Sequence, residues 1–348
     1  MGERSSSESG APAAASPAAK RSFTVDALKG FAICCVVLGH AVLRNVPDPP
    51  SSPLYLTLSA FEMPLFMFLS GYVLPGRVRS PRWRWVGDRA LRLMVPFFAW
   101  QAIFYLSLRV LEPESFFTAQ TLEGLGRNLI RVTSGPTAGL WYLPALLLCS
   151  AMLAGLYSVR EHPIVILMAG WIGFLLLSQV REQLGIEADY GLLKATTYWV
   201  FFAAGFAYKQ LGYAIDLHRA RRAWPLLTFP LWAAPVASWS AAAGVAVAAL
   251  SKIALGLIGT GFSVVLMNVG EKLARAAKLD RIGRMSLGIY CSHWLFLRVE
   301  FTDGAVGAAA SFVFSLTCAA AVAWLVAAWG PTNAVLLGGW PRRKATAR

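Results

Sequence analysis

Long apolar segments recur along almost the whole chain, and they limit its possible folds more than any other feature. Only 14% of the 348 residues are charged, whereas a soluble domain has about 25%. We therefore predict an all-α integral membrane protein with about ten transmembrane helices. The predicted spans are residues 25–44, 54–74, 93–111, 140–158, 163–180, 192–211, 224–239, 243–267, 286–301 and 305–328.

The chain divides into three predicted regions. Residues 1–22 are rich in Ser, Ala and Pro and are predicted to be a disordered cytoplasmic tail. Residues 23–330 form the transmembrane domain, and residues 331–348 a basic cytoplasmic tail. The seventh span is expected to be kinked because it contains three prolines. All five cysteines fall inside apolar windows, so they are interpreted as packing residues rather than a disulfide framework.

Positive charges lie mostly on one side of the predicted membrane. The assignment gives 23 Lys and Arg residues on one side and 7 on the other, with Lys29 and Lys252 inside spans. This asymmetry predicts that both termini are cytoplasmic. It also accounts for most of the net charge of +14. The expected partner is therefore membrane lipid, with no nucleic acid, and the expected location is the plasma membrane with multiple spans.

Several ionisable residues lie inside the predicted spans, where they are costly and usually functional. Lys29 and His40 are eleven residues apart on the first span, which places them on one helical face about 16 Å apart. Asp26 lies three residues before Lys29 and can pair with it. Glu62 lies in the second span at about the same membrane depth as His40. A carboxylate near an imidazole can orient its ring. His293 is a further histidine in the ninth span.

Simpler interpretations exist for each of these residues. A histidine in a membrane helix can form an ordinary hydrogen bond across a helix interface, and Lys29 can extend to the membrane surface. The arginines between residues 77 and 92 can be a topology signal alone. Glu62 has the weakest simple interpretation, because a buried carboxylate needs a partner or water.

Five segments occur together in a recognisable order. They are FTVDALKGFAICCVVLGHA, FEMPLFMFLSGYVLP, DRALRLMVPFFAW, GLWYLPALLL and MSLGIYCSHWLF. This series resembles the membrane-bound acyltransferase 3 family, particularly its short members that are similar to fucose 4-O-acetylases. The resemblance covers about residues 23 to 300. It implies a ten-helix membrane enzyme that moves an acyl group, usually acetyl from acetyl-CoA, onto a hydroxyl of a glycan or another acceptor.

The family's motifs match this chain at particular residues. Lys29 and His40 match a basic residue and a histidine on the first helix, with Lys where many members have Arg. Arg89 and Arg92 match a basic pair that opens the third helix, and Tyr290 and His293 match a motif in the ninth. Glu62 departs from the pattern, because related short members often have His there. Many members also carry a soluble hydrolase-like domain that completes the transfer. No such domain is expected in this sequence, so the chain is expected to act alone or with a separate acyl-accepting partner protein.

The chemistry of acyl transfer suggests a role for each group. His40 is the predicted catalytic base or acyl carrier, because imidazole titrates near neutral pH. Glu62 is the second predicted catalytic residue. Cations suit the phosphates of acyl-CoA, and oxyanion donors are needed for the transition state. The predicted donor-binding residues are Lys29, Arg89 and Arg92, the predicted substrate-binding residues are Asp26, Trp141, Tyr290 and His293, and no metal is expected.

The predicted function is therefore membrane O-acyl transfer from acyl-CoA to a hydroxyl of a cell-surface glycan or other sugar-containing acceptor. A cytoplasmic thioester would reach His40, in the outer half of the membrane, through a cavity between helices. Two alternatives remain open. The acceptor can be a secondary metabolite, or the protein can be a non-enzymatic transporter of polysaccharide or lipid-linked sugar. The absence of a visible internal repeat speaks against transporters built from two matching halves.

Overall fold

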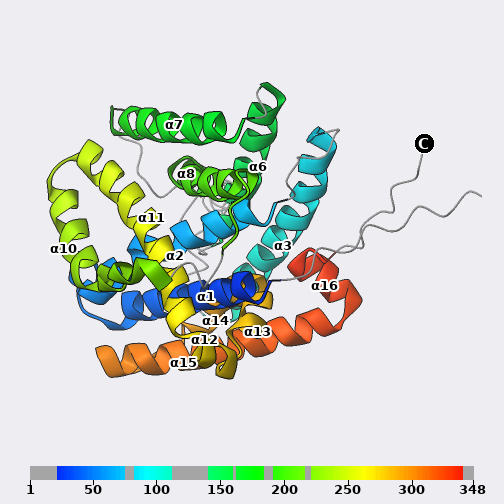
Figure 1. The fold of residues 1–348 in the computed structure, drawn as a ribbon. Coiled ribbons are helices and arrows are strands. Elements are labelled where there is room, and N and C mark those ends of the chain that lie inside the picture. Colours follow the sequence, from blue (N-terminus) through cyan, green and yellow to red (C-terminus); the bar gives the residue numbers. More distant parts are fainter. Residues whose placement is uncertain are drawn as a thin grey trace, which may run out of the picture.

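The computed structural model describes residues 22–74, 82–111, 140–159, 162–183, 191–215 and 221–339. Across these ranges the secondary structure is entirely helical (Figure 1). The first half contains α1 (Phe23–Asn45), η1 (Pro49–Ser51), α2 (Pro53–Tyr72), α3 (Arg82–Leu111), α6 (Tyr142–Val159), α7 (Pro163–Gln183) and α8 (Gly191–Gln210). The second half contains η3 (Arg221–Thr228), α10 (Phe229–Ala242), α11 (Val245–Val269), α12 (Glu271–Ala276), α13 (Leu279–Arg284), α14 (Ser286–Phe296), α15 (Ala305–Ala328) and α16 (Gly330–Leu337).

Each of the ten predicted windows contains a helix, so the all-α fold class is confirmed. Four helices of the described chain are both long and apolar enough to cross a membrane by length and composition, namely Phe23–Asn45, Pro53–Tyr72, Ala246–Val269 and Ala305–Ala328. Two shorter apolar helices lie at Tyr142–Tyr157 and Pro163–Gly173. The number of ten spans and the cytoplasmic location of the termini remain predictions.

Two of the windows differ in detail from their helices. Helix α3 begins at Arg82 rather than at residue 93, so Arg89 and Arg92 belong to the helix itself. Arginine is a good helix former, and hydropathy alone underestimates a helix with a charged first half. The seventh window divides into η3 and α10, with Pro230 near the start of α10 and Pro235 inside it. This break agrees with the predicted kink.

Three short helices were not predicted. Helices α12 and α13 have six residues each and lie in the basic segment before α14, and α16 follows α15. They are too short or too polar to give a spanning signal. Helix α16 is attached to α3 by a hydrogen bond from Trp100 Nε1 to Leu336 O, at 2.9 Å. Residues 1–21 and 340–348 of the predicted tails lie outside the described residues.

Glycines allow the central helices to approach one another closely. Helix α1 packs against α13, and side chains added at Gly30 or Gly283 would collide with the backbone of the other helix, at Leu279 and Asp26 respectively. Helix α2 packs against α8 in the same way, with Gly71 facing the backbone of Phe202. Small residues at helix contacts are typical of membrane proteins, because backbone proximity increases van der Waals packing.

The outer helices expose apolar surface, as expected for contact with lipid. Helix α15 has a mean hydropathy of 2.0, yet only 22% of its most apolar stretch is buried. Val306 on α15 is 77% exposed, and Leu231 on α10 is 79% exposed. Such exposure would be unfavourable in water but not in hydrocarbon. These helices therefore support a membrane location.

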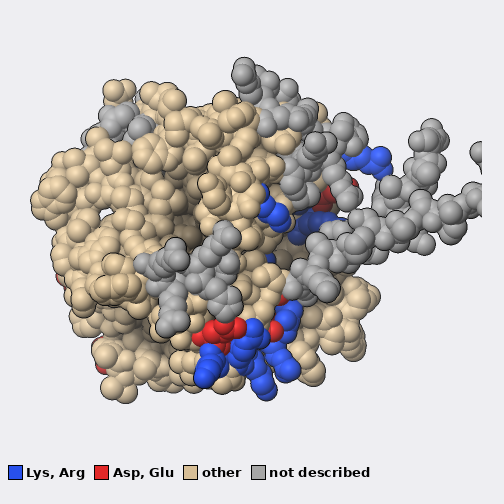
Figure 2. All heavy atoms as spheres, in the orientation of Figure 1, with Lys and Arg blue, Asp and Glu red and all other residues tan. Residues whose placement is uncertain are grey.

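Charged side chains are unevenly distributed on the surface. On the face drawn in Figure 2, Lys and Arg gather over α12 and α13 together with acidic side chains, and a second group lies beside α3. The part of this face over α10 and α11 is largely uncharged. Two ion pairs stabilise the short helices themselves, Arg275 with Glu271 and Arg284 with Asp280. On this face the charge is therefore concentrated in these two groups.

Candidate active site

Two predicted histidines from distant parts of the chain form a direct pair. His40 Nδ1 on α1 lies 3.0 Å from His293 Nε2 on α14. The two rings are almost parallel, with an interplanar angle of 12° and centroids 5.2 Å apart. A short nitrogen–nitrogen distance together with this longer centroid distance indicates rings joined edge to edge. The contact is therefore an in-plane hydrogen bond rather than a stack.

The hydrogen bonds of His293 determine the tautomers of both neutral rings. His293 Nδ1 lies 2.8 Å from the carbonyl oxygen of Tyr290 and 3.1 Å from that of Ile289. A carbonyl only accepts, so Nδ1 of His293 must carry a hydrogen and its Nε2 must be an acceptor. His40 then donates through Nδ1. The lone pair of His40 is left at Nε2, which is the atom a general base or nucleophile needs.

The environments of the two rings differ. His293 is fully buried, and its backbone carbonyl accepts a hydrogen bond from Ser315 Oγ at 2.8 Å. His40 remains partly exposed, and Trp294 packs against it with ring centroids 4.7 Å apart. His293 is thus placed as an orienting group, while His40 is the more exposed of the two residues.

Glu62 lies close to this pair but is not part of its hydrogen bonds. The residue is only 8% exposed, and its Oε2 would lie 3.0 Å from a Cβ atom added at Gly39, the residue before His40. Within the described chain, Oε2 has no hydrogen-bond partner. The orienting contact that sequence reasoning considered for Glu62 is made by His293 instead.

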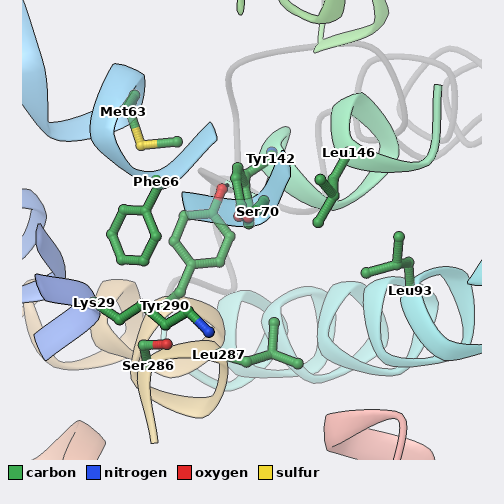
Figure 3. A pocket seen from close by; sticks show the side chains of 10 residues that line it. All are labelled: Lys29, Met63, Phe66, Ser70, Leu93, Tyr142, Leu146, Ser286, Leu287 and Tyr290. Atoms are coloured by element: carbon green, nitrogen blue, oxygen red, sulfur yellow. Dashed lines mark hydrogen bonds between the residues drawn. The ribbon is translucent and has the colours of Figure 1, made fainter. Parts of the chain in front are cut away.

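A cavity of about 190 Å³ lies between α1, α2, α3, α6 and α14 (Figure 3). Its polar groups come from Lys29, Ser70, Tyr142, Ser286 and Tyr290, and the rest of the lining is apolar. Tyr290 connects the cavity to the histidine pair, because its ring centroid lies 6.0 Å from that of His293. Of the predicted residues, Lys29 and Tyr290 therefore line this cavity, while His293 lies beside Tyr290 outside the lining.

Hydroxyl groups are ordered along one wall of this cavity. The Tyr142 hydroxyl lies 2.6 Å from Ser70 Oγ. The backbone N–H of Tyr142 donates to the Tyr290 hydroxyl at 3.2 Å. Since Tyr142 is the first residue of α6, this bond satisfies a free N–H group at the helix start. The Tyr290 hydroxyl is therefore the acceptor in this bond.

Arg89 is positioned beyond one end of the cavity. Its Nε donates to Ser150 Oγ at 2.6 Å, and its guanidinium lies 5.5 Å from the centroid of the Trp85 ring. Leu93 and Leu146, one helical turn from Arg89 and Ser150 respectively, both line the cavity. Arg89 is therefore close to the cavity, although it is not among its lining residues.

Arg92 and Asp26 occupy more peripheral positions. The backbone of Arg92 packs against Gly338, which ends α16 with a φ of +65°. The backbone of Asp26 packs against Gly283 of α13. An ion pair between Asp26 and Lys29 is not among the contacts of the described residues. Neither Arg92 nor Asp26 is a lining residue of the cavity.

Trp141 belongs to a group of stacked rings and cations that sequence reasoning did not assemble. Its ring stacks on Tyr198 with centroids 5.0 Å apart. Lys194 Nζ lies 5.1 Å from the Trp141 ring, and Lys252 Nζ lies 5.0 Å from the Tyr198 ring. Cations over aromatic faces are stabilised, especially away from water. Lys252 could have been noticed in the sequence, because it is a charged residue within a predicted span. Nothing in the sequence marked Tyr198.

No metal centre is indicated within the described ranges, which contain no group of three or more His, Cys, Asp or Glu residues suited to hold an ion. The arrangement instead offers a basic nitrogen, ordered hydroxyls and two partly buried cations, Lys29 and Arg89, in or near a cavity. These are the groups that acyl transfer requires. Fold and site together define a class of membrane-embedded helical protein suited to this chemistry.

Comparison with known proteins identifies the family. Residues 23–329 match the family model of the acyltransferase 3 proteins, described as an acyltransferase domain. The chain therefore belongs to the acyltransferase 3 family.

Two curated relatives are nodulation proteins NolL. The protein from Sinorhizobium fredii (strain NBRC 101917 / NGR234) is 30% identical over 198 residues, which is 55% of this chain and 49% of the relative. The protein from Mesorhizobium japonicum (strain LMG 29417 / CECT 9101 / MAFF 303099) is 26% identical over 196 residues, or 55% and 48%. The matches thus span about half of each relative's length. No solved structure matches the chain significantly.

Proposed function

We propose that the chain is a multi-pass plasma-membrane O-acetyltransferase. It moves an acetyl group from acetyl-CoA to a hydroxyl of a sugar-containing acceptor such as a cell-surface glycan. The observation that carries this proposal is the His40–His293 pair, because its hydrogen bonds leave the lone pair at Nε2 of a partly exposed His40. Membership in the acyltransferase 3 family supports the reaction class.

His40 acts at the acceptor hydroxyl. Its Nε2 removes the hydroxyl proton while the oxygen attacks the thioester carbonyl of acetyl-CoA. The carbon–sulfur bond then breaks, and the imidazolium returns the proton to the departing thiolate. The products are the acetyl ester and CoA. If Nε2 instead attacks the thioester directly, the carbon–sulfur bond breaks, CoA leaves as the thiolate, and an acetyl-imidazole forms; the acceptor hydroxyl then attacks its carbonyl, the imidazole leaves, and the hydroxyl proton goes to the thiolate.

His293 is a positioning residue in this mechanism. Its Nε2 accepts from His40 Nδ1, which holds the ring orientation and keeps the lone pair at the reacting edge. The same hydrogen bond persists when His40 becomes protonated, since the imidazolium also donates through Nδ1. The arrangement corresponds to the orienting partner of a catalytic triad, with an imidazole in place of the carboxylate.

The donor enters by way of the Lys29 cavity. A volume of about 190 Å³ is smaller than a usual site for a drug-sized ligand, roughly 300–1,000 Å³. We therefore expect the cavity to hold only the acyl end of acetyl-CoA and part of its flexible arm. Lys29, Arg89 and Arg92 would attract the phosphates by charge-assisted contacts.

Other predicted residues have supporting roles. Tyr290 is the proposed oxyanion donor, because it lines the cavity and its ring lies beside His293. Glu62, next to Gly39, provides a buried acid–base group near His40. Trp141 precedes Tyr142 on the cavity wall and is proposed to contact substrate, and Asp26 supports the start of α1.

The test is acetyl transfer by the purified full-length chain. Protein in lipid nanodiscs is given radiolabelled acetyl-CoA, and both CoA release and label transfer to methyl glycosides are measured. Release and transfer that disappear in His40→Gln support the proposal. A wild-type protein that transports sugar across vesicles but never consumes acetyl-CoA would favour the transporter alternative.

The nature of the acceptor requires a separate measurement. Comparing acetylated products of cells with and without the gene distinguishes a surface glycan from a secondary metabolite. If transfer needs an additional protein that becomes acetylated first, a separate acyl-accepting partner is part of the system. These measurements decide which molecule is the acceptor, and the proposed chemistry at His40 is the same in each case.

A further inference from the structure

A second cavity lies at the opposite end of the two helices that carry the histidine pair. It has a volume of about 240 Å³. It is formed by the end of α1 and the segment that joins α14 to α15. Its lining residues are Arg44, Asn45, Val299, Glu300, Phe301 and Asp303. None of these residues takes part in the mechanism described above.

The two cavities lie on opposite sides of the histidines along the chain. Arg44 follows His40 by four residues on α1, which is about one turn and 6 Å. On the other helix, the lining segment begins shortly after His293, beyond the end of α14. Lys29 and Ser286, which line the first cavity, precede the same two histidines. A substrate in each cavity would therefore approach the His40–His293 pair from a different end.

Several polar side chains that line the second cavity have no hydrogen-bond or ion-pair partner within the described chain. Within the described chain, no hydrogen bond or ion pair engages the side chains of Arg44, Glu300 or Asp303. Asn45 is only 8% exposed, and its Nδ2 donates to Ala41 O at 2.8 Å, which leaves Oδ1 as the acceptor it can offer. One cation, two carboxylates and a carboxamide provide both donors and acceptors.

The cavity is also held in shape by the backbone. The N–H of Gly304 donates to the carbonyl oxygen of Asn45 at 2.6 Å, which attaches the start of α15 to the end of α1. Gly304 has a φ of +88°, a conformation that favours glycine. Phe301 packs edge-on against Phe314 of α15, with centroids 5.8 Å apart. Polar groups on a fixed frame are suited to selective recognition.

From this arrangement we propose that the second cavity is the acceptor site and that it binds a neutral sugar ring. Charges of both signs disfavour an anionic or a cationic ligand, whereas several hydroxyl groups can use the donors and acceptors together. The apolar face of the sugar would lie against Phe301 and Val299. This inference rests on the proposed function, because it assigns the acceptor of that reaction to a particular place.

The experiment separates acceptor recognition from donor chemistry. Full-length protein in nanodiscs is assayed with acetyl-CoA and a series of neutral methyl glycosides. Glu300→Gln and Asp303→Asn are expected to raise the KM for the best glycoside about ten- to a hundredfold, since each removes a charge-assisted hydrogen bond. The KM for acetyl-CoA and the rate of CoA release without sugar should stay unchanged.

Asp48→Asn is the matched control. Asp48 lies just beyond the same end of α1, outside the cavity, and its φ of +48° is compatible with asparagine. This variant makes the same chemical change on the same side of the molecule and should leave the glycoside KM unchanged. An equal effect in Asp48→Asn and Asp303→Asn would overturn the assignment.

A binding measurement keeps the two proposals distinguishable. Saturation-transfer NMR detects methyl glycosides bound to the full-length protein without any turnover. If the wild type binds the glycosides and the Glu300 and Asp303 variants do not, the site is supported even where acetyl transfer is absent and the proposed function fails. If the wild type transfers acetyl groups but the variants bind and react normally, the acceptor site is wrong while the function stands.

Discussion

At the scale of single residues, His40 is partly exposed, and its Nδ1 atom is hydrogen-bonded to His293. We predict that His40→Ala, His40→Asn and His40→Gln all lose acetyl transfer by about 10²–10⁴-fold, the usual cost of losing a general base. Their thermal stability should change little, because one interhelical hydrogen bond contributes only about 0.6–2 kcal/mol. Rates and melting temperatures in nanodiscs check this. Substantial turnover by the amide variants would assign His40 to packing.

His293 should behave differently from His40, because it orients rather than reacts. His293→Gln can still accept a hydrogen bond from His40 Nδ1 through its side-chain oxygen, whereas His293→Ala cannot. We therefore expect His293→Ala to lower kcat by about 10- to 100-fold and His293→Gln to recover much of the loss, with the KM for acetyl-CoA unchanged. Full activity in His293→Ala would remove its positioning role.

Arg89 is expected to contribute to donor binding rather than to the chemical step. Replacing Arg89 and Arg92 by Ala should raise the KM for acetyl-CoA about ten- to a hundredfold, because charge-assisted contacts contribute about 1.5–3 kcal/mol each. Arg275→Ala, which removes an exposed cation from α12, is the control. If the double variant binds acetyl-CoA as tightly as the wild type, Arg89 and Arg92 do not bind the donor and serve only as a signal for membrane orientation.

Sequence reasoning identified the two histidines separately but could not predict their contact. They are 253 residues apart in the chain, and a distance of that kind depends on how all the intervening helices pack. The same limit applies to Arg89 with Ser150 and to the stack around Trp141. Rare polar residues in apolar spans signal a site, whereas their partners depend on tertiary structure.

At the scale of helices, the contact between α1 and α13 depends on two glycines. A side chain at Gly283 would collide with the backbone of Asp26. We predict that Gly283→Leu separates the helices and lowers the melting temperature and the yield of folded protein. Gly87→Leu on α3 is the control, because open space surrounds that position. Fluorescence-detected gel filtration with heating measures both, and equal stability would show that α13 is not needed to hold α1.

Hydropathy predicted where the long helices lie but not the short ones. Helix α13 has a basic sequence and six residues, so no window method would mark it as part of the core. Yet its contact with α1 supports the segment that carries Lys29. The reason is that backbone proximity, set by Gly30 and Gly283, does not depend on hydrophobicity.

At the scale of the whole molecule, the charge distribution predicts one orientation in the membrane. On the face drawn in Figure 2, Lys and Arg gather over α12 and α13 and beside α3, and an uneven distribution of positive charge sets orientation by the positive-inside rule. We predict that reporters fused at either terminus respond as cytoplasmic, and that a cysteine placed at Asp48 is labelled only from outside. A terminus that reports as external would require a different number of spans.

The hydrogen bonds of His293 have a consequence for the energy stored across the membrane. A proton that reaches His40 can pass to His293 Nε2 but no further, because His293 Nδ1 already faces carbonyl oxygens of its own helix. The His40–His293 pair can therefore hold a proton but does not conduct protons onward. If the two substrates come from opposite sides of the bilayer, as proposed, transfer at this pair would not open a path for protons, and we predict that reconstituted vesicles hold a pH difference during turnover.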